Sequence, residues 1–208
     1  MLKLTLQASA VNFQAFLARK KHPVFQKLAA EVWAQDHYTC QYCGFQSTKH
    51  MEIVNKDYNY DHNKRSNFVT ACIFCAQCQF LNGLAADYYG GGVLIFLPEL
   101  SQNKLCGLSH VLLQAMEESG DYKDTAQNIY QALRNRATLV ETQLGEGMSQ
   151  PDHFGKVLID YQRNHKKTPA ELLNKLRLLP LRSCFKQEID DWLAEKDSIA
   201  QRLKTVAE

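Results

Sequence analysis

Apolar and polar positions alternate with two different periods along this chain, and each period predicts a kind of element. Near the start, Leu2, Leu4 and Leu6 alternate with polar residues, which is typical of a short, half-buried strand. Residues 24–35 carry apolar residues at helical spacing after Pro23, a residue that suits the first turn of a helix. The side chains expected on the buried face of this helix are Phe25, Leu28, Val32 and Trp33.

Between residues 39 and 75 the apolar runs are short and are separated by turn-forming residues. This segment therefore predicts short strands and tight turns. Residues 76–88 return to a helical pattern that ends at the three glycines of residues 90–92. The apolar run 93–97, closed by Pro98, predicts a buried strand.

Helical periodicity dominates beyond residue 100. One helix is expected after a cap at Ser101, with an apolar stripe formed by Leu105, Leu108, Leu112 and Ala115. A second stripe is formed by Ala126, Ile129, Tyr130, Leu133, Ala137 and Val140. Residues 145–155 predict a loop, and the apolar run 157–159 is too short to separate strand from helix.

Two further helices are predicted near the C-terminus. A capping box with proline at the first helical position predicts a helix over 169–176; its residues are Thr168, Pro169, Ala170 and Glu171. A final helix is marked by Ile189, Trp192, Leu193, Ile199, Leu203 and Val206. Apolar stripes of this kind ordinarily pack in a core, and a groove for a partner's helix is the alternative.

Composition excludes several classes of protein. The 208 residues are 45% hydrophobic and 22% charged, which is enough for a sizeable core and unlike a disordered chain. Residues 1–17 lack the pattern of a secretory signal, and the longest apolar runs fall far short of the roughly 20 residues of a membrane span. We therefore expect a soluble, cytoplasmic protein with reduced thiols. A formal net charge of +2 demands no large basic face for nucleic acid.

Cysteines give the strongest chemical signal. Cys40 and Cys43 form one pair and Cys72 and Cys75 another, each with two residues between the thiols. Two such turns aim four sulfur atoms at one ion and complete the tetrahedral shell that Zn²⁺ accepts. The sequence therefore predicts one structural zinc, closed to water and substrate, and this site would bring the formal net charge to about zero. Unrelated buried thiols, a redox dithiol and an iron–sulfur cluster are the alternatives.

The three remaining cysteines are interpreted as structural. Cys78 continues the spacing of the second pair and is a rival ligand, but from one turn into a helix its thiol would point elsewhere. Cys106 and Cys184 lie in apolar helical stretches, where a buried thiol packs as a small hydrophobic group.

These signals together predict an α+β protein. Six of the seven cysteines precede residue 107, whereas helical periodicity follows residue 100. Residues 1–100 are expected to form a zinc-organised part with small antiparallel strands, and residues 101–208 a mostly helical part. We expect the two parts to pack as one compact unit.

The segment around the cysteines resembles the zinc-bearing branch of the HNH endonucleases. The resemblance rests on residues 36–44, with sequence DHYTCQYCG, on residues 51–53, with sequence MEI, and on residues 67–75. It implies a ββα-metal core, in which an Asp-His pair follows the Glu-Ile strand. In that family the histidine is the general base, and a second metal polarises the scissile phosphate.

The catalytic part of that motif is missing. The Asp-His pair falls on Val54 and Asn55; valine cannot bind a metal, and an amide has no basic lone pair near neutral pH. Ala76 follows the second cysteine pair, and of the family's polar set only Asn67 is retained. Candidate replacements in the nearby loop are Asp57, Asp61 and His62. An HNH-like fold without its base is expected to be a binding protein and not an enzyme.

The whole chain resembles a subunit of the coupling complex of Dot/Icm type IV secretion systems. The resemblance is carried by the 40–75 core without its histidine and by residues 88–102, with sequence YYGGGVLIFLPELSQ. It implies a cytoplasmic adaptor that binds the C-terminal extension of the coupling ATPase DotL, together with DotM and the IcmS-IcmW adaptor. It also implies recruitment to the inner face of the inner membrane and a role in effector recruitment. The sequence does not single out a partner-binding surface.

Two alternatives stay open. The chain could be a metal-dependent endonuclease that uses the loop 57–67. It could also bind nucleic acid without cutting it, stacking bases on Tyr58 and Tyr60 and gripping phosphates with Lys64 and Arg65.

Overall fold

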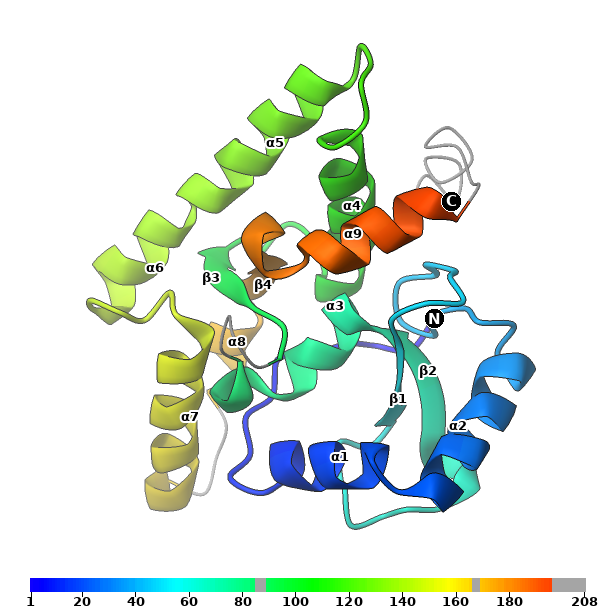
Figure 1. Cartoon of the computed structure of the whole chain (residues 1–208). Coiled ribbons are helices and arrows are strands. Elements are labelled where there is room, and N and C mark those ends of the chain that lie inside the picture. The colour runs from blue at the N-terminus through cyan, green and yellow to red at the C-terminus, as the bar shows by residue number, and fades with distance from the viewer. Residues whose placement is uncertain (85–88, 166–168, 196–208) are drawn as a thin grey trace.

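The protein has a mixed α/β fold with two small antiparallel sheets, as a computed structural model shows for residues 1–84, 89–165 and 169–195 (Figure 1). The strands are β1 (Met51–Asn55), β2 (Phe68–Cys72), β3 (Gly92–Phe96) and β4 (Leu176–Pro180). The helices are α1 (Asn12–Lys20), α2 (Pro23–Gln35), α3 (Ile73–Ala76), α4 (Gln102–Ala115), α5 (Lys123–Asn135), α6 (Ala137–Leu144), α7 (Pro151–His165), α8 (Ala170–Leu173) and α9 (Lys186–Ala194).

The first sheet pairs β1 with β2, with Met51 opposite Cys72 and Asn55 opposite Phe68. Helix α2 packs on one face of this sheet, where a small apolar cluster joins α2 to the strands. The members of this cluster are Ala29, Val32, Ile53 and Phe68. Burial of this stripe is what the helical pattern of residues 24–35 predicts.

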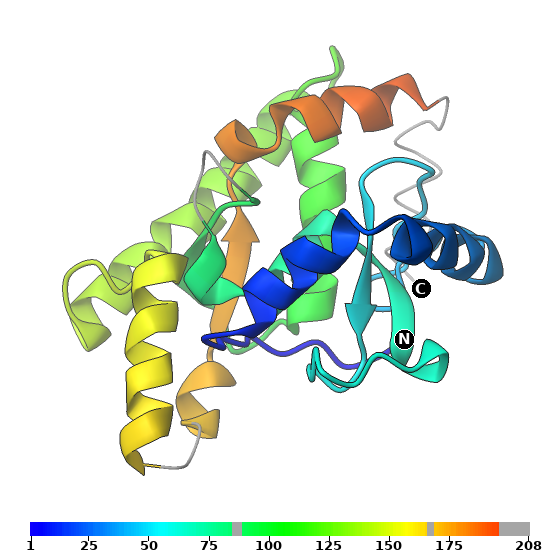
Figure 2. The same cartoon turned by 60° about the horizontal axis from the view of Figure 1, so that its bottom comes forward.

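The second sheet pairs β3 with β4, with Gly92 opposite Pro180 and Phe96 opposite Leu176. Helices α3 and α4 lie between the two sheets in both views of the ribbon (Figure 1, Figure 2). The side-chain amide of Gln102, at the start of α4, accepts a hydrogen bond from Leu178 N and donates one to Leu178 O, both at 2.9 Å. Gln102 therefore substitutes for a neighbouring strand at the outer edge of β4.

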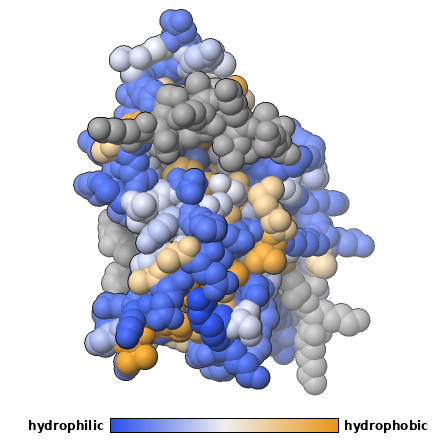
Figure 3. Space-filling view, turned by 90° about the vertical axis from the view of Figure 1, so that its right-hand side faces the viewer, coloured by the Kyte–Doolittle hydropathy of each residue, from blue (hydrophilic) through white to orange (hydrophobic). Residues whose placement is uncertain are grey.

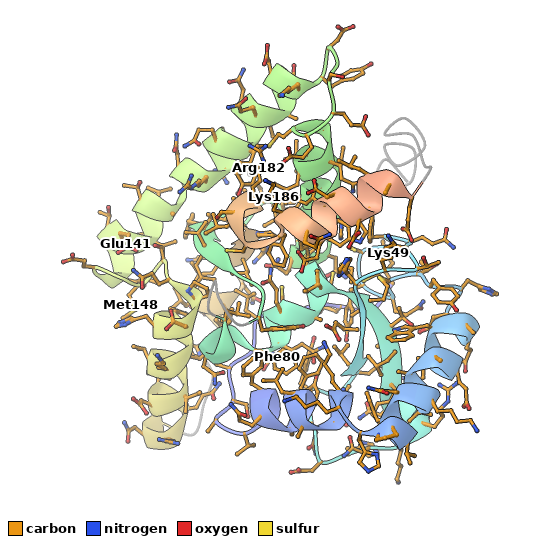
Figure 4. The ribbon with its side chains drawn as sticks, viewed as in Figure 1. Lys49, Phe80, Glu141, Met148, Arg182 and Lys186 are labelled. Carbon is orange, nitrogen blue, oxygen red and sulfur yellow. The ribbon has the colours of Figure 1, made fainter. Side chains whose placement is uncertain are left out.

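One hydrophobic core joins both halves of the chain, from Leu4 to Trp192. Aromatic rings next to the cysteines make part of the connection. The His110 ring of α4 stacks on Phe45 at 3.5 Å and on Phe74 at 4.3 Å between centroids. Trp192 of α9 packs edge-on against Phe74. Elsewhere in the core, Phe80 lies above α1 (Figure 4).

Helix α9 also contacts the loop that leads into β1. Lys49 lies beside the C-terminal end of α9 (Figure 4), and its carbonyl accepts a 3.3 Å hydrogen bond from Trp192 Nε1. The ring of His50 is 2.6 Å from Asp191 through Nε2 and Oδ2. The end of the described chain is thus tied to the segment between the first cysteine pair and β1.

Several sequence predictions are confirmed. Helix α2 begins at Pro23 as expected, and strand β3 covers most of the run 93–97. Helix α4 follows Ser101, whose hydroxyl accepts a 3.3 Å hydrogen bond from Lys104 N and so caps the first turn. The segment 39–75 contains the short strands and turns that its pattern predicts.

The predicted N-terminal strand is wrong in type but right in burial. Leu4 and Leu6 are buried, yet residues 1–9 form no strand. The backbone there bonds to unconnected elements: Leu2 N donates to Gln41 O, and Gln7 N donates to Cys78 O. Because these acceptors do not lie along one strand, no ladder forms.

The helix predicted over 76–88 is also wrong. The chain instead has α3 and two 3₁₀ turns, Gln77–Gln79 and Leu81–Gly83, and residues 85–88 lie outside the described residues. Phe80 interrupts the helix with φ −140°. The buried Gln77 side chain accepts a 2.9 Å hydrogen bond from Gly91 N, so tertiary contacts replace helical bonding.

Other boundaries differ from the predictions. The stripe 126–140 is divided between α5 and α6 at Arg136, and Ile129 is exposed. The run 157–159 lies in α7, which already begins at residue 151 inside the predicted loop. The helix expected over 169–176 covers only α8, because Leu176 already pairs in β4. Thr168 of the capping box and the final apolar positions Ile199, Leu203 and Val206 lie outside the described residues.

Helix α1 and strand β4 are absent from the sequence predictions.

Among the helices of the described residues, none combines the length and the apolar character needed to cross a membrane.

Candidate metal centre

The first cysteine pair lies in a tight hairpin that follows α2. Thr39 and Gln46 form an isolated antiparallel bridge across it. Within the turn, Gly44 N donates to Cys40 O at 2.9 Å, and Gly44 has a φ of +78°. This left-handed conformation favours glycine, which explains why a glycine follows Cys43 in the turn.

The second pair lies where a strand becomes a helix. Cys72 is the last residue of β2 and the N-cap of α3, and Cys75 lies within α3. Antiparallel pairing sets Cys72 opposite Met51 at the start of β1. The sheet therefore fixes where the second pair meets the hairpin of the first.

The four thiols of Cys40, Cys43, Cys72 and Cys75 converge. Their sulfur atoms all lie within 4.8 Å of one another, and the sulfurs of Cys43 and Cys72 are 3.6 Å apart. Four sulfurs bound at about 2.3 Å to a tetrahedral ion would be roughly 3.8 Å apart. The four cysteines are thus close enough to hold one metal ion.

Electrostatics of this cluster favour a cation. Cys40, Cys72 and Cys75 are buried and Cys43 is half-buried. Burial raises the pKa of the Cys72 and Cys75 thiols well above the ordinary value, because a buried thiolate without a counter-charge is unfavourable. A divalent ion at the centre would supply that counter-charge, so this donor set fits a thiophilic metal.

The other cysteines lie outside this cluster. The Cys78 thiol donates to Phe74 O at 3.3 Å, and the Cys106 thiol approaches the same oxygen at 3.6 Å. Cys184 is half-buried and lies against Gly91. Within residues 1–84, 89–165 and 169–195, no other group of three or more His, Cys, Asp or Glu side chains is close enough to hold an ion.

The two positions onto which the HNH resemblance would place a catalytic pair are buried. Val54 and Asn55 are both 0% exposed. The Asn55 side chain accepts a 2.6 Å hydrogen bond from Arg19 Nη1 and donates to Asn59 O at 2.7 Å and His62 O at 3.2 Å. Both ends of the amide are therefore engaged within the protein, and no face of it points to solvent.

Arg19 completes this seal, and sequence reasoning missed it. Its Nη2 donates to Ile53 O at 2.6 Å, and its guanidinium lies 4.5 Å from the Tyr60 ring centroid and 4.7 Å from that of Phe25. Burial lowers the pKa of Arg19 to about 10. No local pattern links Arg19 to residue 55, because they lie in elements far apart along the chain.

An exposed polar pair lies beyond the seal. His62 Nδ1 is 2.6 Å from Asp57 Oδ2, and Asn67 donates to Asp57 Oδ1 at 2.8 Å. Slight burial acts to raise the pKa of Asp57, but the hydrogen bonds from His62 and Asn67 outweigh it and lower this pKa. Two of the three proposed replacement residues, Asp57 and His62, are thus brought together.

The aromatic pair suggested for base stacking is not available. Tyr60 is buried, and its hydroxyl donates to Gln79 Oε1 at 2.9 Å. The Tyr58 hydroxyl donates to Lys3 O at 3.1 Å, which holds that ring against the N-terminal segment. This loop therefore cannot offer both rings to a nucleic acid strand.

Comparison with known proteins gives a match over nearly the whole length. No family model matches the chain. The chain is 43% identical to the type 4 apparatus protein DotN of Legionella pneumophila subsp. pneumophila (strain Philadelphia 1) over 192 residues. The match covers 92% of this chain and 90% of that protein. The similarity is therefore not confined to the cysteine motif.

Proposed function

Because the chain belongs to the DotN family of Dot/Icm type IV secretion apparatus proteins, we propose that it is a non-catalytic adaptor subunit of the coupling complex. In this proposal it binds the C-terminal extension of the coupling ATPase DotL and helps effector recruitment. DotM and the IcmS-IcmW adaptor belong to the same complex, which recruits the chain to the inner face of the inner membrane.

The proposal includes one structural zinc held by Cys40, Cys43, Cys72 and Cys75. The all-sulfur donor set and the convergence of the four thiols support zinc. When bound, such an ion supplies fold stability and no open coordination position. We also interpret β1, β2 and α3 around these cysteines as a degenerate HNH-like core.

One observation carries the non-catalytic part of the proposal. Asn55 stands where the HNH family has its general base, and its buried amide is engaged by Arg19 and by two carbonyls of the following loop. A general base must reach the proton it abstracts, and an amide has no basic lone pair. This position therefore stabilises the loop 56–67 and takes no part in chemistry.

We propose further that residues 1–100 and 101–208 fold as one unit. The pairing of β3 with β4 and the stacking of His110 on Phe45 support this. Residues 1–100 produced alone would lack β4, α4 and α9. We expect this fragment to show no cooperative thermal unfolding, whereas the full chain unfolds in one transition.

The partner proposal is tested by coexpression of the full chain with the C-terminal extension of the coupling ATPase. We expect the two to elute together from a size-exclusion column after affinity purification through the ATPase segment. Separate elution of two well-folded components would reject the adaptor proposal.

One observation favours nuclease activity as a second candidate function: Asp57 and His62 form an exposed pair at 2.6 Å. An aspartate that holds one nitrogen of a histidine leaves the other free to act as a base. Plasmid nicking in Mg²⁺ or Mn²⁺ that disappears in His62→Ala would establish this candidate. We expect no nicking by the natural chain, and the matched variant His153→Ala controls for loss of an exposed histidine.

A further inference from the structure

A groove of about 490 Å³ lies between α1 and α2. Its walls are mostly apolar: Ala15 and Ala18 come from α1, and Val24, Phe25 and Leu28 come from α2. The alanines lie three residues apart on one face of α1, and their small side chains leave the space that the larger residues of α2 border. Figure 3 looks onto the side of the molecule where α2 lies, and apolar patches interrupt its mostly polar surface.

The groove exposes apolar surface on a rigid base. Val24 is 72% exposed, although it lies in the first turn of a well-formed helix. Phe25 and Leu28 are half-buried against the cluster under α2, and the Phe25 ring packs edge-on against Phe68 at 5.6 Å. Contiguous apolar surface that is fixed by packing from below is typical of a binding groove.

Charges around the groove are mainly positive. Lys20 is neutralised by Glu52 at 2.5 Å, but Lys21 and Lys27 are exposed and form no ion pair with any residue that the structure describes. The acidic residue of α2 is Glu31, one turn beyond Lys27. Lys21 adjoins His22 and Lys27 adjoins Leu28, two residues that line the groove, so both uncompensated lysines lie next to the lining along the chain.

We propose that this groove binds an acidic amphipathic helix of a partner protein. Apolar side chains at helical spacing would insert between α1 and Val24, while carboxylates beside them would face Lys21 and Lys27. A concave groove between two helices suits inserted side chains, whereas a bilayer surface would meet only the exposed rim. The inference rests on the proposed function, because the C-terminal extension of the coupling ATPase is the expected source of the helix.

The test measures the affinity of the full chain for the purified, fluorescently labelled C-terminal extension of the coupling ATPase. Val24→Asp places a carboxylate in the groove without disturbing the core, and we expect at least a tenfold loss of affinity. Lys27→Glu should weaken binding severalfold, with a smaller effect at high salt. The control Tyr122→Asp changes a 68% exposed aromatic residue at the start of α5 and should leave the affinity within twofold.

The possible outcomes distinguish failure of the groove proposal alone from failure of the adaptor proposal. If the natural chain and Val24→Asp bind the extension equally well, the groove proposal is wrong and the adaptor proposal stands. If the natural chain does not bind the extension, both proposals fail. If Val24→Asp binds the extension normally but no longer binds phosphatidylglycerol vesicles that the natural chain binds, the groove serves a lipid surface and the helix proposal is wrong.

Discussion

The two sheets of this protein have strands of equal length and the same antiparallel pairing, yet they are assembled in different ways. β1 and β2 are joined by residues 56–67, and Cys72, the last residue of β2, is one of the four cysteines whose thiols converge. β3 and β4 are separated by residues 97–175 and lie among apolar side chains of the common core. A two-stranded sheet is only marginally stable alone, so each sheet needs support from outside its strands. The first sheet lies beside the cysteine cluster, and the second is packed among apolar side chains.

The edges of the two sheets show the same contrast. In the first sheet a charged group closes each edge: Arg19 donates to Ile53 O at 2.6 Å, and Asp36 accepts from Thr70 N at 2.8 Å. In the second sheet a neutral amide, Gln102, closes the edge of β4. Both arrangements prevent pairing with another chain. We therefore expect the first sheet to depend on metal and charge, and the second on packing and neutral hydrogen bonds.

The largest effect is expected for Cys72→Ser, which would break the first sheet at its metal centre. Zinc should fall from about one ion per chain to near zero, and the melting temperature should fall by roughly 10 °C or more. Elemental analysis and thermal unfolding measure both. Cys184→Ser, outside the cluster, is the matched control and should keep its zinc. Full zinc content in Cys72→Ser would show that these thiols do not form the site.

A smaller loss is expected for Arg19→Ala, which opens the edge of the first sheet without touching the metal. It leaves Ile53 O and the Asn55 amide oxygen without their donor, so we expect a loss of about 2–4 kcal/mol in unfolding free energy. Denaturant unfolding measures this value. Arg163→Ala removes only an exposed ion pair with Asp160 and should change stability by less than about 0.5 kcal/mol. Equal effects of the two variants would contradict the sealing role of Arg19.

The corresponding change in the second sheet is Gln102→Met, which keeps the size of the side chain and removes its polar atoms. Leu178 N and O then lose their partners, and we expect a loss of about 1–3 kcal/mol with zinc content unchanged. The exposed Gln143→Met on α6 is the control. Zinc loss in Gln102→Met would show that the two sheets do not have separate sources of support.

The smallest effect concerns pH and the contact of α9 with the segment before β1. The hydrogen bond from the His50 side chain lowers the pKa of Asp191 below its usual value. Stability from this group is therefore present above the unfolded pKa of about 4 and is lost as pH falls through the lower folded pKa.

Asp191→Asn should accordingly melt slightly below the natural chain at pH 6, and the two curves should converge in strong acid. Melting temperatures measured from pH 2.5 to pH 6 test this. A constant gap across that range would contradict the linkage.

The same contrast explains how much of the fold can be predicted from the sequence. The convergence of the four cysteines is indicated by their local spacing, and the run before Pro98 identifies β3. The sequence does not predict β4, because residues 176–180 contain Arg177 and follow a helix start, and only pairing with β3 makes them extended. The helix predicted over 76–88 failed for a related reason, since the buried Gln77 side chain bonds to Gly91. The secondary structure of both segments is determined by contacts with residues distant in sequence, and the local periodicity of apolar residues carries no information about such contacts.

The candidate site divides in the same way. The spacing of the cysteines in the sequence indicates the four that converge in the structure, and the resemblance to HNH endonucleases directs attention to Asn55. The sequence does not show that Asn55 is sealed, because the seal comes from Arg19 on another element. The pairing of Asp57 with His62 depends on the fold of the loop, which residue types alone leave open.

Native mass spectrometry of the full chain coexpressed with the C-terminal extension of the coupling ATPase tests the central claim most directly. The account predicts a complex of the two proteins with one zinc for each copy of this chain, and loss of that zinc in Cys72→Ser. Detection of this chain without zinc and without the bound ATPase segment would contradict both the structural zinc and the adaptor role.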